Sequence, residues 1–174
     1  MNMNRTDNNQ TMKENICMAT EADKDEILAL YKSVVGSDHC VWTDDYPSRE
    51  TIEFDLSRDA LFVMKNPDDN SIIAAISIDL DEEVEELEVW DKSLTPVAEL
   101  SRLAVKEEYQ GKKIAATMME RAIEILKERG YKGVHILVQK DNQKALNSYK
   151  RFNYKDCGLI TFWGHYYFCF EKNI

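Results

Sequence analysis

Residues 97–138 place a long amphipathic helix between two apolar strands, and this order restricts the possible folds more than any other feature of the sequence. Residues 97–105 and 134–138 are predicted strands, and the second is apolar throughout, which is typical of a strand buried on both faces. Residues 111–129 form the predicted helix, because apolar side chains recur along one of its faces. A strand, a crossover helix and a second strand predict an α/β domain built on a sheet.

The remaining patterns add hairpins and further helices to this unit. Strands are predicted at residues 16–18, 60–64, 71–78 and 162–170, and helices at 20–36, 48–57 and 142–152. Turn-forming residues at 65–70 join two of these strands into a hairpin. The element order predicts an α/β fold: a single domain with a mixed, mostly antiparallel central sheet and helices on both faces.

Composition limits the classes of partner. The 174 residues correspond to roughly one domain. The net charge of −10 argues against a nucleic-acid partner and against an anionic membrane. Residues 1–14 are polar and are predicted to be a flexible leader before a domain at 15–174.

The lack of recognisable targeting signals and the cysteine spacing bear on the compartment and on metal binding. The sequence shows neither a membrane span nor an export signal, so we expect a cytoplasmic protein whose four cysteines are reduced. Their spacing does not match a zinc site, so no metal is expected.

The junction after residue 105 has the composition of an anion site. The strand end Leu103-Ala104-Val105 leads to Gln110, Gly111, Lys112, Lys113, Ile114 and Ala115 at the predicted helix start. The first N–H groups of a helix lack intrahelical partners and carry a partial positive charge, so they bind a diphosphate well. Many ordinary helices also begin with Gly and Lys, so this signal alone is weak.

A second signal is the pair Asn142 and Tyr149, which lie two helical turns apart and so share one face about 10 Å apart. With the first signal they resemble the GNAT (Gcn5-related) N-acetyltransferase family. Gln110, Lys113 and Ala115 after Leu103 and Val105 match its acetyl-CoA motif, and Asn142, Ala145, Tyr149 and Phe152 match its next motif. Lys113 stands where the family has glycine, so we expect it to be helical, with its side chain turned away or onto a phosphate.

The resemblance implies direct transfer of an acetyl group from acetyl-CoA to an amine. It implies that pantetheine lies between the strands at 97–105 and 134–138, that an N–H near Leu103 polarises the thioester, and that Asn142 binds the pantetheine arm. Tyr149 would protonate the leaving thiolate. Strand alternation places Glu99 on one face with Ser101 and Leu103, where Glu99 is the candidate base, directly or through a water; otherwise it is an ordinary strand residue.

Two segments offer acceptor contacts. Trp42, Asp44, Asp45 and Tyr46 form a candidate wall for a cationic amine, or else the two aromatic residues close the core edge. The acidic residues 79–91 either attract cations or form a solvated loop. His165, Tyr166 and Tyr167 line the other wall, an interface or the core.

The leading hypothesis is therefore an N-acetyltransferase acting on an amine of a small cationic molecule or peptide. The alternative is a CoA-binding sensor or interaction module without catalysis. An aromatic C-terminal strand also makes a homodimer possible.

Overall fold

The computed structural model describes residues 12–37, 40–149 and 152–174, and these form a seven-stranded sheet. The strand order is β1-β2-β3-β4-β5-β7-β6, and neighbours are antiparallel except for β4 and β5, which are parallel. The strands are β1 (Ile16–Met18), β2 (Leu61–Lys65), β3 (Ile72–Asp79), β4 (Val97–Val105), β5 (Gly133–Gln139), β6 (Lys155–Phe162) and β7 (His165–Asn173).

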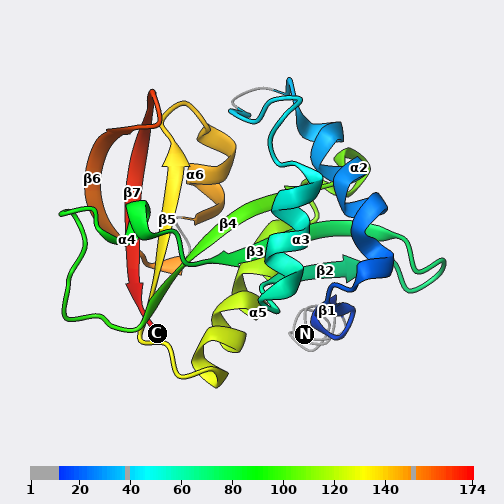
Figure 1. Ribbon diagram of the computed structural model, residues 1–174, viewed down its shortest axis with the longest axis horizontal. Helices are drawn as coiled ribbons and strands as arrows, with labels where there is room; N and C mark the ends of the chain where they lie inside the picture. The colour runs from blue at the N-terminus through cyan, green and yellow to red at the C-terminus, as the bar shows by residue number, and fades with distance from the viewer. Residues whose placement is uncertain (1–11, 38–39, 150–151) are drawn as a thin grey trace, which may run out of the picture.

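Helices cover both faces of the sheet, so the predicted fold class is confirmed (Figure 1). They are η1 (Glu21–Asp23), α2 (Lys24–Val34), α3 (Arg49–Ser57), α4 (Glu82–Glu85), η2 (Glu107–Tyr109), α5 (Ile114–Glu128) and α6 (Gln143–Tyr149). Ser48 begins α3 by accepting a hydrogen bond from the Thr51 N–H at 3.2 Å, as expected of an N-cap. Within the described residues, no helix has the length and hydropathy needed to cross a membrane.

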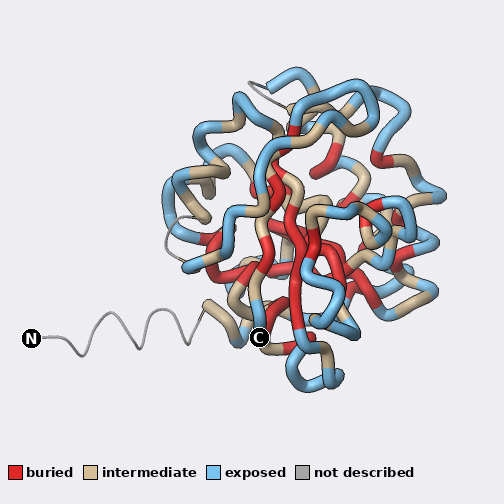
Figure 2. Tube along the Cα trace, turned by 90° about the vertical axis from the view of Figure 1, so that its left-hand side faces the viewer, coloured by how far each residue is buried: buried red, intermediate tan, exposed pale blue. Residues whose placement is uncertain are grey.

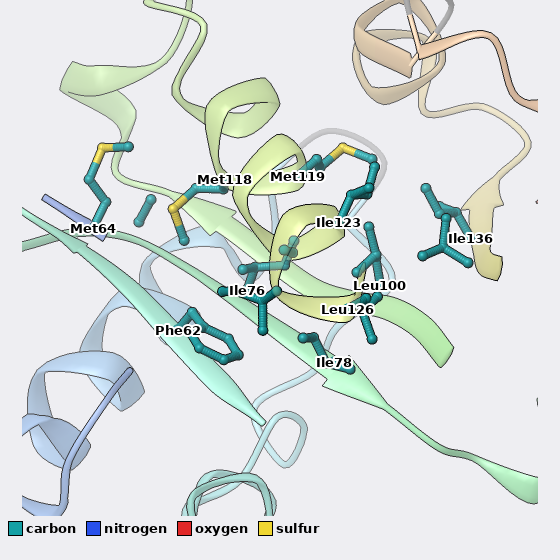
Figure 3. Packing of buried hydrophobic residues seen from close by; sticks show 14 of the residues in the cluster. Phe62, Met64, Ile76, Ile78, Leu100, Met118, Met119, Ile123, Leu126 and Ile136 are labelled. Carbon is teal, nitrogen blue, oxygen red and sulfur yellow. The ribbon is translucent and has the colours of Figure 1, made fainter. Parts of the chain in front are cut away.

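Two of the three hydrophobic clusters among the described residues hold α2, α3 and α5 to the sheet, and the third includes Val84 of α4. On one face, α5 buries Met118, Met119, Ile123 and Leu126 against residues of β2 to β5 (Figure 3). On the other face, Ile27, Leu30 and Tyr31 of α2 and Ile52 of α3 pack on Leu61, Val63, Ala75 and Ala104. Figure 2 shows the buried residues concentrated along the central strands, with exposed residues in the connections.

The C-terminal end differs from the predicted single strand over residues 162–170. Residues 155–173 form a hairpin, β6 and β7, which turns at Trp163 and Gly164. Both turn residues have positive φ, 46° and 78°, as two-residue hairpin turns of this handedness require. The predicted strand was wrong because aromatic residues on both sides of the turn, and Trp163 within it, mask the break in the pattern.

The predicted helix at 111–129 begins later than expected. Gly111 has a φ of 75° and Lys113 a φ of 66°, so both lie in the left-handed region and α5 starts at Ile114. The expectation that Lys113 is helical is therefore wrong: it is the N-cap residue. A left-handed lysine costs about 1–2 kcal/mol relative to its right-handed conformation, which is why glycine is favoured at such a position.

Two predicted segments extend beyond the described residues. Residues 1–11 of the leader lie outside them, whereas Met12 packs against the α5 core and Lys13 Nζ lies 2.6 Å from a Glu124 carboxylate oxygen on α5. The predicted helix at 142–152 is described as far as Tyr149, and residues 150–151 lie outside the described chain.

A β-bulge in β4 changes which side chains share a face. Ser101 pairs with Ser77 and Ala104 with Ala75, so two residues of β4, Arg102 and Leu103, face one residue of β3. Arg102 has a φ of 48°. The prediction that Glu99, Ser101 and Leu103 share one face is therefore wrong: Leu103 packs on the α5 core, whereas Ser101 pairs with Ser77 on the α3 side.

The parallel pair β4 and β5 separates soon after it forms. The strands are paired at Val97–Gly133, Ala98–Val134 and Glu99–His135. In the described chain the pairing ends there, and Figure 1 shows the strands diverging from their common end. Because β4 remains paired with β3 and β5 with β7, each keeps one unpaired edge towards the other.

Leu126→Ala should lower the free energy of unfolding by about 2–5 kcal/mol, because it removes a fully buried side chain between α5 and the sheet. Lys127→Ala, at the exposed neighbouring position, is the control and should change it by about 0.5 kcal/mol or less. Urea denaturation measures both. Equal losses for the two variants would contradict the assigned core.

Candidate functional site

A cleft of about 1700 Å³ lies where β4 and β5 diverge. It is lined by both strands and by residues of the β4–α5 junction, α2, α6 and the β6–β7 hairpin. Ten of the predicted cofactor-binding residues line it: Leu103, Ala104, Val105, Gln110, Gly111, Lys113, Ile114, Ala115, Asn142 and Tyr149. Lys112, also predicted, does not line the cleft; its ammonium lies 4.9 Å from the centre of the Tyr109 ring.

One end of the cleft is suited to an anion. The left-handed residues Gly111 and Lys113 turn the chain into α5, whose first N–H groups have no intrahelical acceptor. Gln110 fixes this turn: its Nε2 donates to the Val105 carbonyl at 3.0 Å, and its Oε1 accepts from Lys144 Nζ of α6 at 2.5 Å. Backbone donors, the helix dipole and nearby ammonium groups are the features with which proteins bind anions.

The middle of the cleft has unused hydrogen-bonding capacity. The facing edges of β4 and β5 beyond Glu99 and His135 have no strand partner in the described chain. The Ser101 hydroxyl is buried and has no hydrogen-bond partner among the described residues. Buried polar groups are normally satisfied, so these groups give the cleft hydrogen-bonding capacity that the described chain does not use.

Asn142 and Tyr149 lie at the two ends of α6, beside the cleft. Asn142 Oδ1 accepts from the Ala145 N–H at 2.9 Å, so it caps α6 and leaves its amide NH₂ as the donor group. The Tyr149 ring packs against the α5 core, and burial raises the pKa of its hydroxyl to about 12. The phenol therefore remains protonated over the physiological range.

Glu99 is the carboxyl group at the point of divergence. It lines the cleft and is only 7% exposed. Burial and the negative charge of Asp79 raise the pKa of Glu99 to about 8, and the positive charge of Arg102 opposes this shift. A carboxyl group poised near neutrality is suited to accepting a proton.

Arg102 centres an ion cluster that the sequence did not suggest. Its Nε and Nη2 reach the two Asp55 oxygens at 3.0 and 2.9 Å, and Nη2 also lies 2.6 Å from Asp79 Oδ2. Nη1 donates to the Tyr46 hydroxyl at 3.1 Å. Burial disfavours the charged forms, but these contacts outweigh it, lowering the pKa of Asp79 and raising that of Arg102. The cluster depends on the bulge, which no local sequence pattern indicates.

A second buried cluster lies on β5 and β7. The His135 ring stacks on Trp90, with centroids 4.0 Å apart, and its Nδ1 lies 3.2 Å from Glu85 Oε1. Its Nε2 lies 3.3 Å from Glu171 Oε2, which accepts from the Asp91 N–H at 2.8 Å. These contacts fasten the acidic segment 80–91 to the sheet beside Glu99.

The acceptor end of the cleft combines aromatic and acidic side chains. Of the predicted wall, Trp42 and Tyr46 line the cleft, whereas Asp44 and Asp45 are exposed and lie outside it. The acids that line this end are instead Asp79, Asp81 and Glu99. From the C-terminal hairpin, the cleft is lined by Trp163, His165 and Tyr167, and Tyr166 is exposed outside it.

The described residues contain no cluster of three or more His, Cys, Asp or Glu residues arranged to hold a metal ion. The four cysteines are free thiols, and Cys169 is buried.

Comparisons with known proteins agree on one family. The model of the acetyltransferase (GNAT) family matches residues 26–154. An uncharacterized N-acetyltransferase of Methanocaldococcus jannaschii is 30% identical over 67 residues, which is 38% of this chain and 30% of that relative's length.

Solved structures show the same fold. An N-acetyltransferase from Staphylococcus aureus Mu50 superposes with a TM-score of 0.72 at 20% identity, covering 91% of this chain and 96% of its own. A chain of the NatC complex bound to Gag peptide and CoA gives a TM-score of 0.72 at 15% identity, covering 91% and 97%. At these identities the likeness concerns the fold alone.

Glu99→Gln should stabilise the protein in a pH-dependent way. The folded state holds the Glu99 proton up to about pH 8, whereas a glutamate in the unfolded chain loses its proton near pH 4.5, so this group costs stability progressively as pH rises between these values. The variant should therefore gain on the order of a few kcal/mol over the natural chain at about pH 8–9 and little at about pH 4–5. Thermal unfolding across this range measures the gain.

Glu86→Gln, at an exposed position in the same acidic segment, is the matched control and should not change the pH dependence. A gain of Glu99→Gln that is equal at all pH values would contradict the raised pKa of Glu99.

Proposed function

Because this chain belongs to the acetyltransferase (GNAT) family, we propose that it is an N-acetyltransferase that transfers acetyl from acetyl-CoA directly to an amine. The observation that carries the proposal is the cleft between β4 and β5, which has an anion cradle at one end and a carboxyl group poised near neutrality at the other. The two ends fit the two reactants, a diphosphate-bearing donor and a cationic acceptor.

The residues of the cleft fit acetyl-CoA. The first turn of α5 and the left-handed turn before it would hold the diphosphate, with Lys113 and Lys144 nearby. The unpaired edges of β4 and β5 and the Asn142 amide would bind the amide-rich pantetheine arm, which supplies the thioester. The N–H of Leu103, the residue after Arg102 in the bulge, is the proposed donor to the thioester carbonyl.

Glu99 is the proposed base. An alkyl ammonium has a pKa near 10, so only about one molecule in a thousand is neutral at pH 7. A carboxylate with a pKa of about 8 accepts this proton with a far smaller penalty than an ordinary carboxylate, directly or through a water. Glu99 retains enough acidity to be ionised in a useful fraction of molecules near neutral pH.

Tyr149 is the proposed acid for the leaving thiolate. Its raised pKa keeps the phenol protonated, and it lines the same cleft as the junction that would hold the diphosphate. A thiol has a pKa near 8.5, so transfer of a proton from the phenol is uphill by a few pKa units unless the two groups approach in the complex. Protonation also prevents the thiolate from attacking the new amide.

The acceptor is proposed to be a cationic amine on a small molecule or a peptide. Trp42 and Tyr46 offer aromatic faces, and Asp79, Asp81 and Glu99 give this end a negative potential. Asp44 and Asp45 lie outside the cleft and are left out of the proposed wall.

Tyr149→Phe should lower kcat by at least about tenfold with little change in CoA affinity, because it removes the proton donor and keeps the ring. Tyr154→Phe, the matched control, changes a buried phenol that does not line the cleft and should leave kcat unchanged. Steady-state kinetics and CoA titration of both variants measure this. Unchanged turnover of Tyr149→Phe would remove Tyr149 from the mechanism.

The proposal as a whole is tested by calorimetric titration with CoA and acetyl-CoA, followed by a screen of amines and peptides for release of free CoA. We expect micromolar binding and amine-dependent CoA release. Binding without acetylation of any amine would support the alternative, a CoA-binding sensor, for which the lysine at the left-handed position 113 is the favouring observation. A folded chain that does not bind CoA would contradict both the proposed acetyltransferase and the CoA-binding sensor.

A further inference from the structure

The ion cluster around Arg102 connects three parts of the proposed site. The guanidinium bridges Asp55 of α3, Asp79 at the end of β3 and the Tyr46 hydroxyl on the acceptor wall. Arg102 is also the left-handed residue of the β4 bulge and lies between Glu99 and Leu103 in the sequence. One buried side chain is therefore bonded to the acceptor wall while its backbone forms the bulge.

We propose that Arg102 and Asp79 are positioning residues for acetyl transfer, which hold the β4 bulge and act on Glu99 with opposite sign through their shared ion pair. This inference rests on the proposed function, because Glu99 is the proposed base. The cluster would then affect the ionisation of Glu99 in addition to its contribution to packing.

The geometry of the bulge supports the first part. A non-glycine residue at a φ of 48° is held there only when its surroundings enforce it. The Arg102 side chain is 7% exposed and is fixed by both Asp55 oxygens, and Asp55 is itself bonded by the Ser77 hydroxyl at 2.7 Å. These bonds oppose rotation of the strand at Arg102, and the next N–H along the chain is the proposed thioester donor.

The strand register supports the second part. Asp79 is the direct cross-strand partner of Glu99, and Arg102 follows Glu99 on the same strand. Among the described residues, the other charged or titratable groups around Glu99 include its β5 neighbour His135, Asp81 and Glu85 of the acidic segment, and Tyr167 and Cys169 of β7. The negative charge of Asp79 favours the protonated form of Glu99, and the positive charge of Arg102 favours the ionised form.

The decisive test compares two variants that break the same ion pair. Arg102→Gln should move the acid limb of the kcat/KM pH profile to higher pH, and Asp79→Asn should move it to lower pH, each by about half a unit or more. If the Arg102–Asp79 ion pair were purely structural, removing either partner should affect the acid limb in the same way. Shifts in the same direction, or no shift in either variant, would overturn the inference.

Arg58→Gln is the matched control. Arg58 pairs with the same two carboxylates, at 2.9 Å from Asp55 Oδ1 and 3.3 Å from Asp79 Oδ1, but it does not line the cleft. It should lower thermal stability and leave the acid limb in place. A limb that moves as far in this variant as in Arg102→Gln would overturn the inference.

Arg102→Lys tests the positive charge separately from the contact geometry. It also keeps the inference testable if Arg102→Gln does not fold. Lysine keeps the positive charge and loses the two-pronged contact with Asp55. The acid limb should stay near its natural position while kcat falls several-fold and KM for acetyl-CoA changes little. An unchanged kcat would contradict the positioning of the bulge.

The failure of this inference is distinguishable from that of the proposed function. If no amine in the screen is acetylated, the proposed function fails, and infrared titration of the Glu99 carboxyl, identified by its loss in Glu99→Gln, still tests the charge effect. That titration should move up in Arg102→Gln and down in Asp79→Asn. If amines are acetylated and the carboxyl does not move in opposite directions, the inference alone fails.

Discussion

The early end of pairing between β4 and β5 is the constraint on which the site depends. Three residue pairs hold these strands together, and after Glu99 and His135 each strand follows its other neighbour. The main-chain groups on the facing edges then need partners that the sheet does not supply. The cleft is therefore a consequence of strand register, and main-chain groups of β4 and β5 contribute to its lining together with polar and charged side chains.

A row of ionisable residues crosses the sheet at the last paired position. Register places Asp79, Glu99, His135, Glu171 and Lys155 side by side on five adjacent strands. Removing charges from water is costly, and buried ion pairs seldom add net stability compared with apolar residues of the same size. The row is thus poorly explained by stability. The raised pKa of Glu99 is instead explained by its burial and by the negative charges of Asp79, Asp81 and Glu85, which the positive charge of Arg102 opposes.

Periodicity was sufficient to predict most elements, whereas the residues predicted to bind a cofactor came from the resemblance to the GNAT family. The apolar runs of β4 and β5 and the α5 face are local patterns, and ten of the predicted cofactor-binding residues line the cleft. The predicted shared face of Glu99 and Leu103 failed because alternation assumes an unbroken strand, and the bulge at Arg102 inverts it. The contacts of Asp55 and His135 are equally inaccessible to local reasoning, since their partners lie 47 and 50 residues away in sequence.

The overall negative charge of the chain explains why main-chain N–H groups are important at the end of the cleft that is suited to an anion. A net charge of −10 repels a polyanion such as CoA at long range, but this repulsion is screened beyond about 8–10 Å at physiological ionic strength. Unpaired N–H groups at the start of α5 act at short range, cannot be titrated and are held in place by the left-handed turn at Gly111 and Lys113. The acidic surface is therefore compatible with the proposed donor site, because long-range repulsion and short-range backbone contacts act over different distances.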